Sequence, residues 1–336
     1  MNFKEKKEYT GNINQLFSVK KYKFIDGKQN DVKAIDISNG TGIDLTILLD
    51  KCMDFAQIKF KGKNLNFITP TGIVSPYFYD DTNEDWLKTW TAGFLTTCGL
   101  SNIGSDCIDQ GKKFGIHGRL SNTPAENINI SMVEEDDIPV LKISGTMKQS
   151  VMFGENLTLK RTIICRYGIN EIEFEDDVYN DGYKSQPIML LYHFNMGYPL
   201  LSEDAKLCIP SKKISGRNDH AQKHIQHWKE ITPPAEKFDE MCYYHDIEEN
   251  ENGISTVGID NEKEKLSVRI HYDRKLLDHF VQWKMLGKGE YVMGLEPCNA
   301  TIDGRSNSRE NKSLKEIKPS EHIIYKFKII VSDKTL

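Results

Sequence analysis

Apolar and polar residues alternate along most of the chain with a period of two. In the segment EIEFEDDV, Ile172 and Phe174 point to one side while Glu173 and Glu175 point to the other. Residues 325–331 repeat the pattern near the end of the chain. This alternation is typical of antiparallel strands with one face in the core. Similar segments recur in the chain, among them VKAIDI, IDLTILL, FAQIKF, PVLKIS and LSVRIHYD.

Clusters of asparagine, glycine and aspartate separate these segments and favour tight turns between strands. Helical spacing is confined to three short stretches, at about residues 12–22, 83–90 and 219–230. Many strands and few helices predict an all-β fold, a large antiparallel sandwich or barrel with a few short helices. No linker stands out, so we expect a single domain over residues 1–336.

Composition and charge exclude several classes of protein. The 336 residues include 44 Lys and Arg against 49 Asp and Glu, a net charge of −5, which gives no basic surface for nucleic acid or an anionic membrane. No apolar run approaches the roughly 20 residues of a membrane helix. The polar start MNFKEKKEYT has no signal-peptide core. Seven cysteines without a CxxC pair are typical of reduced thiols, so we expect a cytoplasmic location.

Two side chains in apolar segments are candidates for proton transfer. His193 lies in LLYHFNMGYPLL, where an imidazole facing a cleft can exchange protons near neutral pH. The alternative is a buried histidine bonded to a backbone carbonyl. Glu296 ends the segment YVMGLEP, where apolar surroundings tend to raise the pKa of a carboxyl and suit a general base. The alternative for Glu296 is an ordinary exposed carboxylate.

The segment FGIHGRL offers candidate binding residues. His117 and Arg119 flank Gly118, which permits close approach of the backbone. Arginine presents a forked donor that suits vicinal hydroxyls or a carboxylate. The alternative is a surface loop in which Arg119 forms an ordinary ion pair.

His220, His224 and His227 are spaced as on one face of a helix, and three imidazoles can bind a transition metal. Lysines lie close by, and no carboxylate is placed as in H-E-x-x-H. We therefore favour a solvated polar helix and expect no metal. Neither G-x-G-x-x-G nor GxxxxGK[ST] occurs, so we expect no nucleotide cofactor either.

Taken in order on an all-β chain, these segments resemble the aldose 1-epimerase (galactose mutarotase) superfamily, and more closely its bacterial branch of galactose-mutarotase-related proteins. His117 in IHG is similar to the family's early histidine, which contacts sugar hydroxyls. His193 in YHFN is similar to its general acid, and Glu296 in GLEP to the base of its Leu-Glu-Pro motif. The resemblance spans about residues 30–332 and implies a single β-supersandwich domain.

The chain departs from the classical family pattern beside two of these positions. It has Arg119 where classical members have the second glycine of His-Gly-Gly, and Tyr192 where they have asparagine before the acid histidine. The family's sugar-binding aspartate has no counterpart that we assign. These changes concern which sugar is bound, and Arg119 suits either an acidic sugar or a plain hydroxyl.

The resemblance implies an isomerase that interconverts the α and β anomers of an aldose or substituted hexose by general acid/base ring opening, without a cofactor. Gln282 and Trp283 form a candidate second wall, because an indole stacks on the apolar face of a pyranose, although Trp283 also suits the core. The expected partner is a monosaccharide, with no nucleic acid or membrane, and a homodimer is plausible at this size. Three alternatives stay open: a non-catalytic carbohydrate-binding or sugar-sensing protein, a hexose-phosphate epimerase, and a metal enzyme that uses the three histidines.

Overall fold

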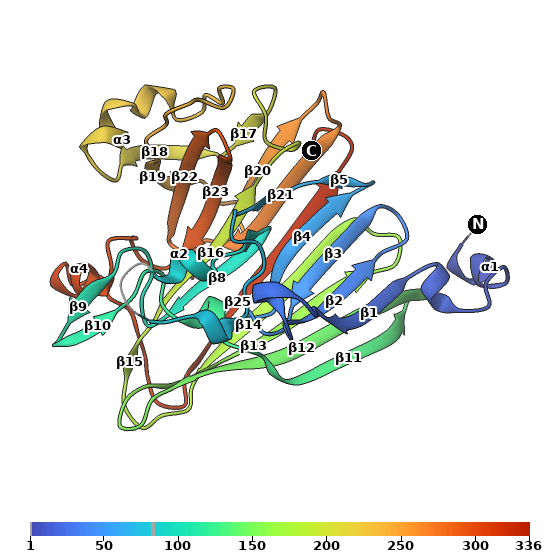
Figure 1. Ribbon diagram of the computed structural model, residues 1–336, viewed down its shortest axis with the longest axis horizontal. Coiled ribbons are helices and arrows are strands. Elements are labelled where there is room, and N and C mark those ends of the chain that lie inside the picture. The colour runs from blue at the N-terminus through green and yellow to red at the C-terminus, as the bar shows by residue number, and fades with distance from the viewer. Residues whose placement is uncertain (1, 82–84) are drawn as a thin grey trace.

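The structure is a computed structural model that describes residues 2–81 and 85–336 (Figure 1). Antiparallel strands make up most of it and the helices are short, which confirms the predicted all-β fold. The largest sheet has eight strands in the order β11-β12-β13-β14-β25-β21-β20-β17. These strands are β11 (Glu126–Glu135), β12 (Ile138–Ser150), β13 (Asn156–Arg166), β14 (Glu171–Asn180), β25 (His322–Ser332), β21 (Leu266–Asp273), β20 (Ile254–Asn261) and β17 (Lys206–Cys208).

Two smaller sheets form the second layer of the sandwich, and β4 contacts β8 where they adjoin (Figure 1). One has six strands in the order β18-β19-β22-β23-β16-β8, and the other has five in the order β1-β2-β3-β4-β5. The six are β18 (Ser211–Gly216), β19 (Met241–Ile247), β22 (His279–Gly287), β23 (Glu290–Cys298), β16 (Met189–Met196) and β8 (Leu95–Leu100). The five are β1 (Ser18–Lys23), β2 (Lys33–Ser38), β3 (Ile43–Leu48), β4 (Asp54–Phe60) and β5 (Lys63–Asn64).

The remaining elements are short. Three two-stranded ribbons are formed by β6 (Phe67–Ile68) with β7 (Ala92–Gly93), β9 (Cys107–Asp109) with β10 (Lys112–Phe114), and β15 (Gln186–Pro187) with β24 (Glu316–Ile317). The α-helices are α1 (Phe3–Lys7), α2 (Asp85–Thr89), α3 (Asp219–Lys223) and α4 (Arg305–Glu310). Within the described residues, no helix has the length and apolar character that crossing a bilayer would require.

The layers meet in a main cluster of buried apolar side chains that runs in sequence from Phe17 to Val331 and includes members of all three large sheets. The alternation seen in the sequence supplies this core. In β14, Ile172 and Phe174 are buried while the neighbouring glutamates face outward. A core shared by the three sheets supports one domain over residues 1–336, which stays a prediction.

A buried ionic network ties the layers together behind the six-stranded sheet. Arg161 of β13 has no exposed surface, and its guanidinium lies 2.6 Å from an Asp176 carboxylate oxygen on β14 and 2.9 Å from one of Asp54 on β4. Asp54 also accepts hydrogen bonds from the backbone and hydroxyl of Thr97 on β8, and Tyr192 of β16 donates to Asp176. The network therefore links strands of all three sheets next to His193.

The predicted helical stretches are only partly helical. Residues 12–22 hold a short 3-10 turn, Ile13–Gln15, and then β1, because Ser18–Lys23 pairs with β2 along its whole length and this pairing overrides the local spacing. The stretch 219–230 forms α3 and a separate 3-10 turn at Ile225–His227. The stretch 83–90 begins outside the described residues and contains α2.

Candidate active site

The two predicted proton-transfer residues lie opposite each other on adjacent strands of the six-stranded sheet. Strand β16 pairs with β23 so that Phe194 faces Leu295, and the same register places His193 opposite Glu296. Phe194 and Leu295 point into the main core. Since successive side chains of a strand point to opposite faces, His193 and Glu296 project together from the other face.

His193 and Glu296 form a close, buried pair. The Nε2 atom of His193 lies 3.3 Å from Oε1 of Glu296, and the two residues are only 4% and 2% exposed. The Nδ1 atom of His193 and Oε1 of Glu296 have no hydrogen-bond partner. Buried polar atoms without partners are costly for a folded protein and are typical of sites that bind a ligand.

Burial changes the proton affinity of both groups. Removal from water raises the pKa of Glu296 well above its ordinary value, and the nearby Glu240 carboxylate raises it further, while Arg217 opposes this. Burial lowers the pKa of His193 well below its ordinary value, and His117 adds to the decrease. Burial therefore favours the arrangement in which neither group is charged, with a neutral imidazole and a protonated carboxyl.

Aromatic rings surround the imidazole of His193. The ring centroids of Trp90, Trp283 and His117 lie 5.3, 5.4 and 5.8 Å from its own. Trp86 stacks on Trp90 at 4.9 Å. The rings and the pair line a cavity of about 280 Å³, named here the inner cavity, together with Leu87, Gly104, Ser105, Ile116, Arg217, Glu240, Cys242 and Ile302. Its aromatic walls and few polar groups are typical of a small-molecule site.

Helix α2 and the chain just after it bring two of these tryptophans to the cavity. The indole N–H of Trp86 donates to the Ser121 hydroxyl at 2.8 Å, and that of Trp90 donates to the Thr96 hydroxyl at 3.0 Å. The buried ammonium of Lys51 donates to the carbonyl of Thr89, the last residue of α2. These bonds fix the tryptophan wall to β8, to the chain before β11 and to the turn between β3 and β4.

His117 faces the cavity from a tight turn. Its backbone has φ of 56°, and Gly118 follows at 68°, where a Cβ would lie 2.6 Å from the Gly99 carbonyl. The Gly104 N–H donates to Nδ1 of His117 at 3.3 Å, which leaves Nε2–H as the free donor. Burial and the charge of Arg217 lower the pKa of His117 to about 3, so the ring is neutral.

The structure does not bring Arg119 into the inner cavity. The same turn that points His117 inward leaves the Arg119 side chain 51% exposed, with Nε 3.5 Å from an Asp81 carboxylate oxygen. This is the ordinary ion pair that the sequence analysis gave as the alternative for Arg119. The cation that lines the cavity is instead Arg217, which sequence analysis missed.

Arg217 enters from the chain after β18 and is held by neighbours far away in sequence. It donates to Asp303 at 3.0 Å and to the Ser105 hydroxyl at 2.7 Å, and Tyr244 also donates to Asp303. Nothing in the sequence around Arg217 or Asp303 indicates that either residue belongs to the site. Trp86 carries a weak signal, because it stands four residues before Trp90 and the two rings stack.

Of the predicted second wall, Trp283 lines the cavity and Gln282 does not. Neighbouring residues of β22 point to opposite faces, so Gln282 is fully buried on the other side of the sheet. There it bonds with His245 at 3.0 Å and donates to the Trp228 carbonyl at 2.9 Å. Trp283 instead donates from its indole N–H to Glu240 at 2.7 Å, on the cavity side.

The three histidines of residues 219–230 do not converge. The rings of His220 and His224 lie 4.6 Å apart, but Nδ1 of His224 bonds with the His220 carbonyl, and His227 pairs with Glu230. Across residues 2–81 and 85–336, no three His, Cys, Asp or Glu side chains gather as metal ligands would.

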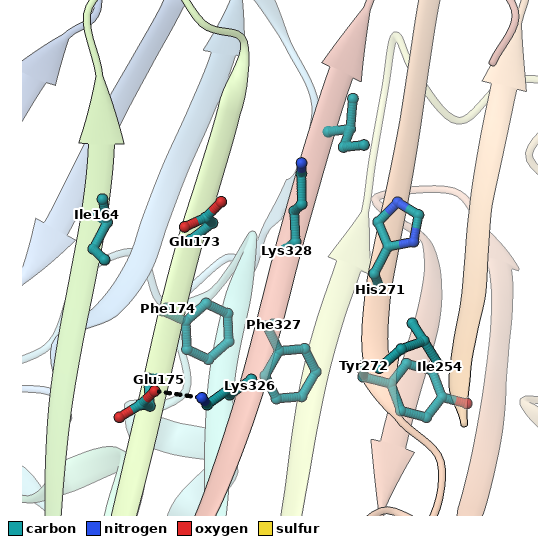
Figure 2. Close-up of a pocket in the computed structure, with 11 residues that line it drawn as sticks. Ile164, Glu173, Phe174, Glu175, Ile254, His271, Tyr272, Lys326, Phe327 and Lys328 are labelled. Atoms are coloured by element: carbon teal, nitrogen blue, oxygen red, sulfur yellow. Dashed lines mark ion pairs between the residues drawn. The ribbon is translucent and has the colours of Figure 1, made fainter. Parts of the chain in front are cut away.

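A second hollow, of about 570 Å³, lies on the outer face of the eight-stranded sheet (Figure 2). Its lysine and glutamate side chains are engaged in ion pairs. Lys326 pairs with Glu175 at 3.4 Å, as the dashed line in Figure 2 shows, and Lys328 pairs with Glu171 at 2.6 Å. With its charges neutralised in this way, it is a weaker candidate than the inner cavity, where buried polar atoms lack partners.

Comparison with known structures agrees with this fold. A Klebsiella pneumoniae protein named as a candidate aldose 1-epimerase matches with a TM-score of 0.90 at 23% identity, over 96% of this chain and 86% of that one. A galactose mutarotase-like protein from Clostridium acetobutylicum matches with 0.67 at 14% identity, over 96% and 100%. A galactose 1-epimerase from Lactobacillus acidophilus matches with 0.58 at 11% identity, over 94% and 99%.

No curated protein matches the sequence. A family model does match, the domain of unknown function DUF4432, over residues 29–331. The chain therefore belongs to the DUF4432 family and has the galactose mutarotase-like fold, as its resemblance to the aldose 1-epimerases implied.

Proposed function

We propose that the protein is a mutarotase-type isomerase, which interconverts the α and β anomers of a free aldose or substituted hexose. The observation that carries this proposal is the buried His193–Glu296 pair, whose Nε2 and Oε1 atoms lie 3.3 Å apart in a cavity walled by aromatic rings. Indole faces stack on the apolar faces of sugar rings, and Arg217 and the neutral His117 can donate to hydroxyls. The resemblance of the chain to aldose 1-epimerases adds support at the level of the fold.

The geometry of the pair suits the two proton transfers that anomer exchange requires. The anomeric hydroxyl and the ring oxygen are bonded to the same carbon, so two groups 3.3 Å apart can each reach one of them. One group removes the hydroxyl proton while the other protonates the ring oxygen, and the bond between ring oxygen and anomeric carbon breaks. After rotation of the carbonyl, the ring closes on its other face with both proton transfers reversed.

The roles assigned from the sequence make Glu296 the base and His193 the acid. These roles require the charged arrangement of the pair, in which Glu296 is a carboxylate and His193 is a protonated imidazolium. Burial disfavours that arrangement in the empty cavity, so these roles depend on substrate hydroxyls that stabilise the carboxylate. In the neutral arrangement the roles are exchanged. Either arrangement supplies one proton donor and one acceptor, and the reaction uses both groups in both directions.

The direct test uses the purified protein with a panel of freshly dissolved aldoses, followed by polarimetry or by NMR exchange between anomers. We expect the approach to anomeric equilibrium to accelerate for at least one sugar, in proportion to protein concentration. A panel in which no sugar equilibrates faster, while some sugar stabilises the protein against heat, would instead favour the non-catalytic sugar-binding alternative.

We expect the loss of kcat/KM for anomer exchange on the acid side to lie below the ordinary histidine pKa of about 6.5. The pKa of His193 is held below the ordinary histidine value of about 6.5, and that of Glu296 above the ordinary glutamate value of about 4.3. Activity then falls below the lowered pKa of His193, where the pair takes up a second proton, and above the raised pKa of Glu296, where the pair loses its remaining proton. A profile from about pH 5 to 9 tests this, and a loss of activity on the acid side centred near about 6.5 would contradict it.

We expect Gly294→Ala to lower kcat by about 10²-fold, because misplacement of a catalytic group by about an ångström has such an effect. A Cβ on Gly294 would lie 2.4 Å from Oε1 of Glu296 and 3.2 Å from Cε1 of His193, so the pair must shift. Gly11→Ala is the matched control, since its Cβ meets nothing closer than 4.0 Å. Wild-type turnover in Gly294→Ala would show that catalysis does not depend on the present geometry of the pair.

A further inference from the structure

The inner cavity adjoins a larger hollow, and the two share part of their walls. A groove of about 850 Å³, named here the outer groove, shares Leu87, Trp90, Glu240 and Trp283 with the inner cavity. Small-molecule sites occupy about 300–1,000 Å³. The inner cavity, at about 280 Å³, is at the lower limit of that range, while the outer groove lies well inside it.

The walls of the outer groove have the chemistry of a carbohydrate-binding surface. The rings of Trp90 and Trp283, 5.6 Å apart, stand where the two spaces meet, and Phe67 and Phe238 add further aromatic surface. Thr69 and Asn218 bring polar side chains to the same groove. Aromatic faces beside polar groups suit a second sugar ring, which has apolar faces and a hydroxylated rim.

The charge of the groove distinguishes between classes of sugar. Asp239, Glu240 and Glu290 line it, and no lysine or arginine is among its described lining residues. In the inner cavity, Arg217 is already paired with Asp303 at 3.0 Å. Carboxylates accept hydrogen bonds from sugar hydroxyls, but they repel a phosphate or a uronate.

We propose that the substrate is an uncharged reducing oligosaccharide, with its reducing ring in the inner cavity and the next sugar ring in the outer groove. This inference rests on the proposed mutarotase function and deepens it. It disfavours sugars that carry a phosphate or carboxylate on the part in the outer groove, where the charge would lie beside Asp239 and Glu240. It also assigns Asp239 as a specificity-determining residue, since that carboxylate is exposed in the groove.

The test compares maltose, cellobiose and lactose with glucose, galactose, glucose 6-phosphate and glucuronate. We expect kcat/KM for at least one disaccharide to exceed that for its reducing monosaccharide about ten-fold. Asp239→Lys should remove this advantage, mainly by raising KM. An effect of about ten-fold is the size expected for one hydrogen bond to a charged group. Glu251→Lys, a change of the same charge at an exposed residue in the turn between β19 and β20, is the control and should keep the advantage.

The outcomes separate this inference from the proposed function. Equal acceleration of monosaccharides and disaccharides, or a preference for the charged sugars, would overturn the groove assignment and leave the mutarotase proposal standing. If no sugar is turned over, binding is read directly from quenching of tryptophan fluorescence by the same disaccharides. Saturable quenching that Asp239→Lys weakens would support the groove, and its absence would overturn it.

Discussion

Replacing Glu296 with glutamine is expected to lower kcat for anomer exchange by about 10²–10⁴-fold, the contribution of one general acid or base. Glutamine has nearly the same shape but cannot gain or lose the shared proton. Because burial raises the pKa of Glu296 and so disfavours its carboxylate, a neutral amide at this position should not destabilise the fold. Polarimetric rates, together with urea unfolding curves for both proteins, measure the two effects separately.

His193→Asn should lower kcat to a similar extent, and the double variant should be little slower than either single one. Residues that act as one unit show such non-additivity, because losing either partner already stops the proton exchange. Glu251→Gln, at an exposed glutamate outside the site, is the matched control and should keep wild-type turnover. Turnover within about ten-fold of wild type in Glu296→Gln would contradict the proposed chemistry.

Arg161→Met is expected to lower the free energy of unfolding by about 3–5 kcal/mol, the usual effect of breaking a buried ion pair from one side. The guanidinium is completely buried between two carboxylates, Asp54 and Asp176. Methionine fills much of the same volume, but it leaves both carboxylates buried without their cation. Urea unfolding at neutral pH, followed by intrinsic fluorescence, measures the loss.

Arg166→Met on the same strand provides the comparison. Arg166 pairs with Glu173 at 3.1 Å, but its side chain is 27% exposed, so solvent screens the pair and its loss should amount to about 0–1 kcal/mol. If the two variants lose similar stability, the network of Arg161 does not hold the layers together as we infer. Because Tyr192 bonds to Asp176 and precedes His193, Arg161→Met should also disturb the neighbouring site.

The strands of the structure could be predicted from the sequence because their signal is local. Alternation places Ile172 and Phe174 inside and their glutamate neighbours outside, wherever β14 lies in the sheet. A histidine and a glutamate within otherwise apolar strands were similarly visible as candidates. The two residues form one pair because β16 and β23 are neighbours in the sheet. The resemblance to the aldose 1-epimerases implied this pairing, but the alternation of apolar and polar residues does not predict it.

Gln282 shows where local reasoning fails. Trp283 and Gln282 are adjacent in sequence and equally suited to a sugar, but a strand presents only one of two neighbouring residues to a given face. Which one is presented follows from the register with β23, where Trp283 lies opposite Gly294. Arg119 was misjudged for a related reason, because the positive φ of His117 and Gly118 reverses the direction of the chain before it.

The sequence by itself determined that this chain builds antiparallel strands, and that two of them carry a histidine and a glutamate in apolar surroundings, since both follow from side-chain periodicity over a few residues. The tertiary structure alone decided the composition of the cavity around them. Arg217 meets Asp303 across 86 positions of sequence, and Trp90 meets Trp283 across 193. Such contacts arise from the order and register of strands, which are set by packing of the whole core rather than by any local pattern.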